Sequence, residues 1–179
     1  MASCCPSMRN RSALAFVIGS IFTFAMLVPA LANPGQTWTQ YRNDRYGFTL
    51  EYPSDLFEVE RTTEAGDGTV FIAAKDDARL LVGALVNDHG FDPESYKQYI
   101  ARKSYAEYRI SYRPMGGSWF VLSGDTQTRM FYEKVMFSCG GRLINSFALV
   151  YPIEQRHIYD PVIERIEDSF RPGRRCGQS

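Results

Sequence analysis

The chain has 179 residues, with 20 basic and 20 acidic side chains and therefore no formal net charge. This balance gives no electrostatic reason to expect a nucleic acid or an anionic membrane as the partner. Only two histidines, His89 and His157, are present, so chemistry that needs an imidazole has few positions to use.

The first 32 residues predict a secretory signal peptide. Arg9 and Arg11 form a basic flank, an apolar run covers residues 13–28, and Pro29 breaks it. Ala30 and Ala32 place small residues at the two positions that a signal peptidase reads, which predicts cleavage after Ala32 and a periplasmic or secreted protein. The alternative is an uncleaved N-terminal membrane anchor, because residues 13–32 are nearly long enough to span a bilayer.

Cleavage would leave residues 33–179 as a single domain, large enough to bury a core without a metal or oligomerisation. The loss of Arg9 and Arg11 would leave 18 basic against 20 acidic side chains, a formal charge of −2. No nucleic-acid partner and no stable membrane insertion are expected after cleavage.

Five strands are predicted first, at residues 38–42, 48–52, 57–60, 70–74 and 79–86, from alternating apolar and polar residues. The Asp67-Gly68 pair between the third and fourth strands favours a hairpin turn. Residues 80–82 and 84–86 are apolar in succession. Such a run indicates a strand that is covered on both faces.

A helix is predicted next, because Asp92 is a good N-cap and Pro93 suits the first helical position. Strands follow at residues 108–112, 119–123, 129–138 and 143–151, with a hairpin turn at 139–141. The last helix ends before Pro172, and its apolar residues have helical spacing: Tyr159, Val162, Ile163, Ile166 and Phe170. This order predicts an α+β fold, a largely antiparallel β-sheet flanked by helices.

Cys139 and Cys176 are the two cysteines that would remain after cleavage. Because exported proteins meet an oxidising compartment, we expect a disulfide between them. A loop of this span is stabilised by roughly 4 kcal/mol in the loop-entropy model. Two alternatives are a reactive Cys139 thiolate, which needs a base or cation nearby, and a zinc site with His89 and His157, which lacks paired ligand spacing.

Other candidate chemistry is weak. Ser123 precedes a glycine but lacks the pattern of a nucleophile elbow, so we expect it in a loop. Turn aspartates lack the spacing of a calcium loop, and the carboxylates of the last helix fit a solvated face. These residues are Asp67, Asp76 and Asp77 in the turns, and Glu164, Glu167 and Asp168 in the helix. No catalytic residue, metal or cofactor is therefore expected.

Tyrosines gather around the first helix and the strand after it: Tyr96, Tyr99, Tyr105, Tyr108 and Tyr112. Partly exposed tyrosines suit protein or ligand contact, because they bury a large area and keep a polar tip in water. They are therefore a possible binding surface. The alternative is that they cap the sheet beneath the helix.

The stretch "YRNDRYGFTLEYPSDLF", with later "FALVYP" and "SFRP" segments, resembles the PsbP-like superfamily, in particular its DcrB-like exported bacterial members. The sharpest motif is aromatic-Gly-Phe-x-x-x-Tyr-Pro, from Tyr46 to Pro53. The resemblance implies an α-β-α sandwich and an accessory or binding role without catalysis. The segments specific to the photosystem subunit are not matched, so a photosynthetic role is not implied.

The expected function is that of an exported, non-catalytic envelope or periplasmic domain that binds a partner protein or a small ligand. The alternative is an envelope hydrolase or thiol enzyme that uses Cys139 or Ser123.

Overall fold

The computed structural model describes residues 36–176. This part of the chain forms strands, then a helix, then strands, then a helix, as predicted. The elements are β1 (Trp38–Arg42), β2 (Thr49–Pro53), β3 (Glu58–Thr62), β4 (Gly68–Ala73), β5 (Ala78–Val86), α1 (Pro93–Lys103), β6 (Arg109–Tyr112), β7 (Trp119–Asp125), β8 (Arg129–Ser138), β9 (Leu143–Pro152) and α2 (Arg156–Ser169), with short 3₁₀ turns at Cys139–Gly141 and Ile153–Gln155.

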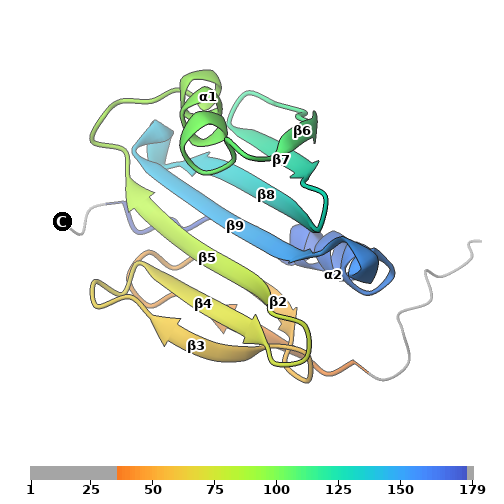
Figure 1. Cartoon of the computed structure of the whole chain (residues 1–179). Helices are drawn as coiled ribbons and strands as arrows, with labels where there is room; N and C mark the ends of the chain where they lie inside the picture. Colours follow the sequence, from red (N-terminus) through yellow and green to blue (C-terminus); the bar gives the residue numbers. More distant parts are fainter. Residues whose placement is uncertain (1–35, 177–179) are drawn as a thin grey trace, which may run out of the picture. The chain divides into compact units, whose positions relative to one another are not determined.

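Seven strands form one antiparallel sheet in the order β3-β4-β5-β9-β8-β7-β6, and β1 pairs with β2 in a separate two-stranded sheet (Figure 1). The predicted hairpin between β3 and β4 is present. The long pairing of β5 with β9, from Arg79 opposite Val150 to Val86 opposite Leu143, joins the first group of strands to the second. The last strand in the sequence thus lies at the centre of the sheet.

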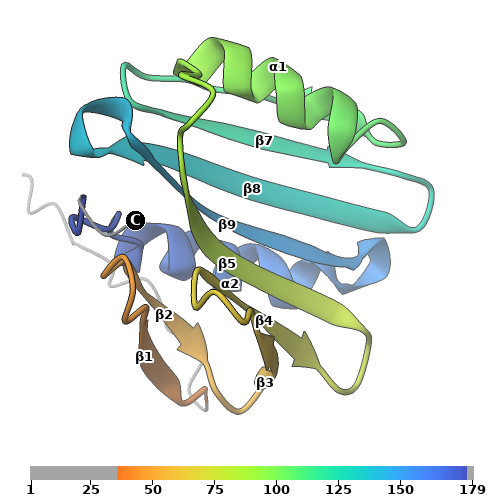
Figure 2. The same ribbon diagram turned by 90° about the vertical axis from the view of Figure 1, so that its left-hand side faces the viewer.

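The two helices lie on opposite faces of the large sheet (Figure 2). α1 packs against β7, whereas α2 packs against β9 and against β2 of the small sheet. The result is the layered α-β-α arrangement with a largely antiparallel sheet that the sequence predicts.

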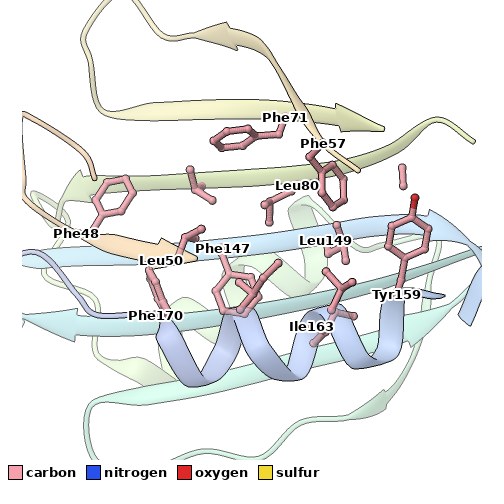
Figure 3. Close-up of a cluster of buried hydrophobic side chains, with 14 of the residues drawn as sticks. Phe48, Leu50, Phe57, Phe71, Leu80, Phe147, Leu149, Tyr159, Ile163 and Phe170 are labelled. Atoms are coloured by element: carbon pink, nitrogen blue, oxygen red, sulfur yellow. The ribbon is translucent and has the colours of Figure 1, made fainter. Parts of the chain in front are cut away.

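The larger core lies between the sheet, α2 and the β1–β2 hairpin (Figure 3). Leu50 of β2, Leu80 of β5, Phe147 of β9 and Ile166 of α2 are all completely buried. Burial of each such side chain stabilises the fold by about 1.5–3 kcal/mol. Since these residues come from four elements, the core fixes the hairpin and α2 against the same sheet face.

The motif from Tyr46 to Pro53 builds the first strand of this core. Gly47 has a φ of +78°, a conformation that residues with a side chain rarely adopt, and it closes the turn before β2. Asn43 holds that turn, because its side chain accepts a hydrogen bond from the Tyr46 amide (2.7 Å) and donates one to the Gly66 carbonyl (2.8 Å). The motif is therefore a structural one.

A second core lies beneath α1 and contains Tyr96 and Ile100 of the helix. The helix begins as predicted, since the Asp92 side chain accepts a hydrogen bond from the Ser95 amide at 2.7 Å. Below it the Tyr105 ring stacks on Phe131, with ring centroids 3.7 Å apart. Aromatic side chains thus fill the space between α1 and the sheet.

This second core contains a buried carboxyl group, Glu133 of β8. Its side chain is 9% exposed and accepts a hydrogen bond from the Tyr105 hydroxyl at 2.7 Å. Burial raises the pKa of Glu133 to about 7, although hydrogen bonds from Tyr105 and Ser146 act in the opposite direction. Burial disfavours the charged form, so this carboxyl loses its proton only as the pH rises through neutrality.

The prediction that residues 80–86 are covered on both faces is wrong. Leu80, Val82 and Ala84 are buried against the larger core, but Leu81 is 40% exposed and Leu85 is 44% exposed on the other face. The reason is the position of α1, which packs over β7 and leaves β5 open on that side. An apolar run alone cannot show how far along the sheet a helix extends.

The segment after α2 is fixed to the sheet. Arg171 pairs with Thr49 through two backbone hydrogen bonds of 3.0 and 2.8 Å. The Gly173 amide donates to the side chain of Asn145, which is completely buried, and the Gly173 carbonyl accepts from Ser138. A Cβ at Gly173 would clash with the Tyr46 carbonyl, so this close approach requires glycine.

Candidate functional site

An open cleft lies on the sheet face that α2 covers, and we call it the α2 cleft. Because α2 packs against β2 and β9, it leaves β6 and β7 uncovered on the same face. The cleft has a volume of about 510 Å³. It is lined by Arg109, Ser111 and Tyr112 of β6, Ser123 and Asp125 of β7, Met130 and Tyr132 of β8, Tyr151 near the end of β9, Ile153 of the following 3₁₀ turn, and Arg156, Asp160, Ile163, Glu164 and Glu167 of α2.

One wall is a polar stripe along α2. Arg156, Asp160, Glu164 and Glu167 follow one another at spacings of three or four residues, so they lie on one side of the helix. Asp160 accepts a hydrogen bond from the Tyr151 hydroxyl (2.8 Å) and pairs with Arg156 (3.3 Å). The beginning of α2 is thereby fixed to the end of β9.

Glu167 joins the other end of this wall to β8. It accepts hydrogen bonds from the Tyr132 hydroxyl and from the Lys134 ammonium group, the latter at 2.8 Å. Burial, together with the bond to Glu167, raises the pKa of Tyr132, which therefore stays a hydrogen-bond donor. The expectation that a solvated helix face accounts for Glu167 is wrong, since β8 brings two polar side chains to it.

The opposite wall is formed by β6 and β7. Arg109 binds both carboxylate oxygens of Asp125, at 2.9 and 2.7 Å from the same nitrogen. This hydrogen bonding holds the pKa of Asp125 below its usual range. In the same wall, Tyr112 is 55% exposed. The wall thus offers both an aromatic ring and a fixed ion pair.

These walls can hold a ligand that is partly apolar and partly polar. Tyr112, Met130 and Ile163 provide apolar surface, while three of the four lining carboxylates already have a cationic partner. Within residues 36–176, the side-chain carboxylate of Glu164 makes no hydrogen bond or ion pair. A donor or cation on a ligand therefore has one carboxylate open to it.

The cleft does not bring a nucleophile and a base together. Ser123 lies within β7 and not in a loop as expected, and its hydroxyl donates to the Phe131 carbonyl at 2.8 Å. Among the described residues, neither His89 nor His157 lines the cleft. A serine without a base within hydrogen-bond reach is a weak nucleophile.

Cys139 and Cys176 form the predicted disulfide, with Cα atoms 5.5 Å apart and a sequence separation of 37. A bridged Cys139 has no thiolate, so the alternative of a thiol enzyme has no nucleophile here. The aspartates have structural partners: Asp76 accepts from Tyr159, and Asp77 pairs with Arg129 at 3.5 Å. Residues 36–176 contain no group of three or more potential metal ligands.

The five tyrosines do not form one surface. Tyr96 and Tyr105 are buried in the second core, and Tyr108 packs at its margin. Tyr99 is 41% exposed on α1, whereas Tyr112 lines the α2 cleft on the other side of the sheet. The interpretation that tyrosines cap the sheet fits Tyr96 and Tyr105, and only Tyr99 and Tyr112 offer substantial surface for binding.

Sequence reasoning missed most of the cleft. Arg109, Asp125 and Asp160 form no pattern in the sequence, because they come from three separate elements. One signal was available in the alternation along β8. One face of this strand carries Met130, Tyr132 and Lys134, a mixture of apolar and polar side chains that is more typical of a partly open surface than of a core.

Ala30 and Ala32 lie outside the described residues. Within those residues, no helix is long and apolar enough to cross a membrane.

Solved structures with this fold were found. The yeast Ran-binding protein Mog1p (Saccharomyces cerevisiae) has a TM-score of 0.57 at 9% identity, with 76% of this chain and 96% of that chain covered. The cyanobacterial PsbP (CyanoP) of Synechocystis has a TM-score of 0.55 at 16% identity, with 81% and 98% covered. LpqN of Mycobacterium tuberculosis, involved in cell envelope biogenesis, has a TM-score of 0.51 at 14% identity, with 78% and 92% covered.

No protein-family model and no curated protein matches the sequence. At these identities the similarity is one of fold. The PsbP-like fold that the resemblance implied is confirmed.

Proposed function

Starting from a PsbP-like fold with an open cleft beside α2, we propose that the chain is an exported, non-catalytic domain that binds a partner protein or a small ligand in the α2 cleft. The observation that carries this proposal is the cleft itself, about 510 Å³ in volume, which is lined by both the exposed Tyr112 and the open carboxylate of Glu164. Ligand sites are typically concave and combine apolar surface with a few polar groups.

Two further observations support it. Mog1p is described as Ran-binding and LpqN as involved in cell envelope biogenesis, so proteins of this fold include a binding protein and a protein with a role in envelope biogenesis. Export is supported by the leader pattern of residues 1–32. An intact-mass measurement of protein from exporting cells tests that part, since we expect a chain that begins at Asn33 and gains two hydrogens on reduction.

Site-specific photocrosslinking tests the cleft. A photoreactive residue would be placed at Tyr112 or at Glu164 and, as a control, at Glu58 on the exposed edge strand β3. We expect adducts from the two cleft positions and none from Glu58. Placement at Tyr99 tests the surface of α1 separately. Adducts from Tyr99 alone would move the binding site to α1.

A ligand-stabilisation screen covers small molecules that crosslinking misses. The proposal fails if no compound raises the melting temperature and no cleft position gives an adduct in the native envelope. Labelling of Ser123 by a serine-reactive probe would instead support the hydrolase alternative, and we expect no labelling because its hydroxyl is bonded to the Phe131 carbonyl.

A further inference from the structure

A second cavity lies where β1, β2 and the segment after α2 meet. It has a volume of about 370 Å³, and four of its lining residues are arginines: Arg42, Arg171, Arg174 and Arg175. Gly47 and Thr49 also line it, and no carboxylate does. It shares no lining residue with the α2 cleft, so its function is independent of the proposal above.

The cavity is built from fixed backbone. Arg42 lies opposite Thr49 in the β1–β2 pairing, and Arg171 pairs with Thr49 on the other side. Two residues further on, Gly173 is held by Asn145 (2.9 Å), and the Arg175 amide donates to the Tyr46 carbonyl at 3.3 Å. The arginines therefore project from paired strands and an anchored segment.

The four guanidinium groups lack acidic partners within residues 36–176. Arg171 donates to the backbone carbonyls of Asp168 (2.7 Å) and Phe170 (2.9 Å), and Arg175 donates to that of Asp44. Other arginines of the chain do pair, as Arg165 does with Glu51 at 3.0 Å. Bonds to neutral carbonyls orient a guanidinium group and leave its charge uncompensated.

The rest of the chain has no acidic side chain to offer. Every Asp and Glu of the sequence lies between residues 44 and 168, so residues 1–35 and 177–179 contain none. Four like charges around one cavity repel each other, and the attraction of an anion bound among them offsets that repulsion. The near-zero net charge of the whole chain conceals this local excess.

We infer that this arginine pocket binds a phosphate group, carried either by a soluble compound or by a lipid headgroup. Guanidinium groups suit phosphate because their planar donors bind two of its oxygens at once. The disulfide has a role in the site, since Cys176 directly follows Arg175 and ties it to Cys139. The bridge thereby keeps Arg174 and Arg175 at the cavity.

The test uses the exported protein with its disulfide intact. Inorganic phosphate and glycerol phosphate are titrated by calorimetry at constant ionic strength, and vesicles of phosphatidylcholine with or without phosphatidylglycerol are tested by co-sedimentation. The double variant R42Q/R174Q removes two charges of the pocket. The control R102Q/K103Q removes two exposed charges at the end of α1.

We expect saturable binding that R42Q/R174Q weakens at least tenfold and the control changes less than twofold. If the soluble phosphates bind, a soluble phosphate compound is sufficient to occupy the pocket. If binding is confined to vesicles with phosphatidylglycerol, the ligand is a lipid headgroup. Equal losses in both variants would show attraction by net charge alone and overturn the inference. So would the absence of binding to every probe.

The role of the disulfide is tested with C139S/C176S, after circular dichroism has shown that the variant is folded. We expect at least a fivefold weaker affinity, because the segment that carries Arg174 and Arg175 loses its covalent attachment. An unchanged affinity in the folded variant would overturn this part. If the variant does not fold, R42Q/R174Q still decides whether the pocket binds phosphate.

Discussion

Replacement of Glu133 by glutamine should stabilise the protein at alkaline pH and have little effect at acidic pH. The pKa of Glu133 is about 7 in the folded protein, against an ordinary value of 4.5, because burial disfavours the carboxylate. The folded state therefore binds more protons than the unfolded state between these values. The contribution of Glu133 to the unfolding free energy is fully present below about pH 4.5 and is lost as the pH rises through about 7.

The size of the effect follows from the difference in pKa. A difference of about 2.5 units corresponds to about 3 kcal/mol of unfolding free energy, at 1.36 kcal/mol per unit. Glu133 is buried beneath α1, so little solvent screening reduces this value. At about pH 5 glutamine resembles the protonated acid in shape, and the variant should lie within about 1 kcal/mol of the original protein.

The assay is urea unfolding of the E133Q variant and of the original protein at several pH values between about 5 and 8.5. All other titrating groups affect both proteins equally, so they cancel in the difference between the two unfolding free energies. We expect that difference to grow by about 2–3 kcal/mol in favour of the E133Q variant across this range, because part of the full effect is already present at about pH 5. E64Q is the control, since Glu64 is exposed in the turn after β3, and its difference should stay flat. A flat difference for E133Q would refute the reasoning.

Three further changes test the packing. Leu50→Ala should cost about 2–5 kcal/mol in urea unfolding, since this completely buried side chain joins the hairpin to the larger core; a loss below about 1 kcal/mol would contradict that placement. Asn145→Ala should lower the unfolding free energy by about 1–3 kcal/mol, because the buried side-chain oxygen of Asn145 accepts a hydrogen bond from the Gly173 amide. Hydrogen exchange of the Gly173 amide should become faster in this variant, and an unchanged exchange rate would argue against that hydrogen bond. Serine at both Cys139 and Cys176 should lower the unfolding free energy by roughly 4 kcal/mol for the 37-residue separation, and equal stability with and without reductant in the original protein would count against the bridge.

The order of the elements could be predicted from the sequence. Asp92 and Pro93 mark the beginning of α1, and the alternation in residues 129–138 marks β8, because such signals depend on neighbours in the chain. The disulfide was predictable for a different reason, since Cys139 and Cys176 are the only cysteines after residue 32, where cleavage is predicted. Cleavage after Ala32 stays a prediction.

The sites depended on contacts between distant residues. The sequence could not show that Glu167 meets Lys134, that Glu133 is buried, or that Leu81 is exposed, because each outcome depends on where the helices lie over the sheet. The arginine pocket needed the pairing of Thr49 with Arg171 across more than a hundred residues. Local periodicity therefore determined what the chain forms, and long-range register determined which side chains meet.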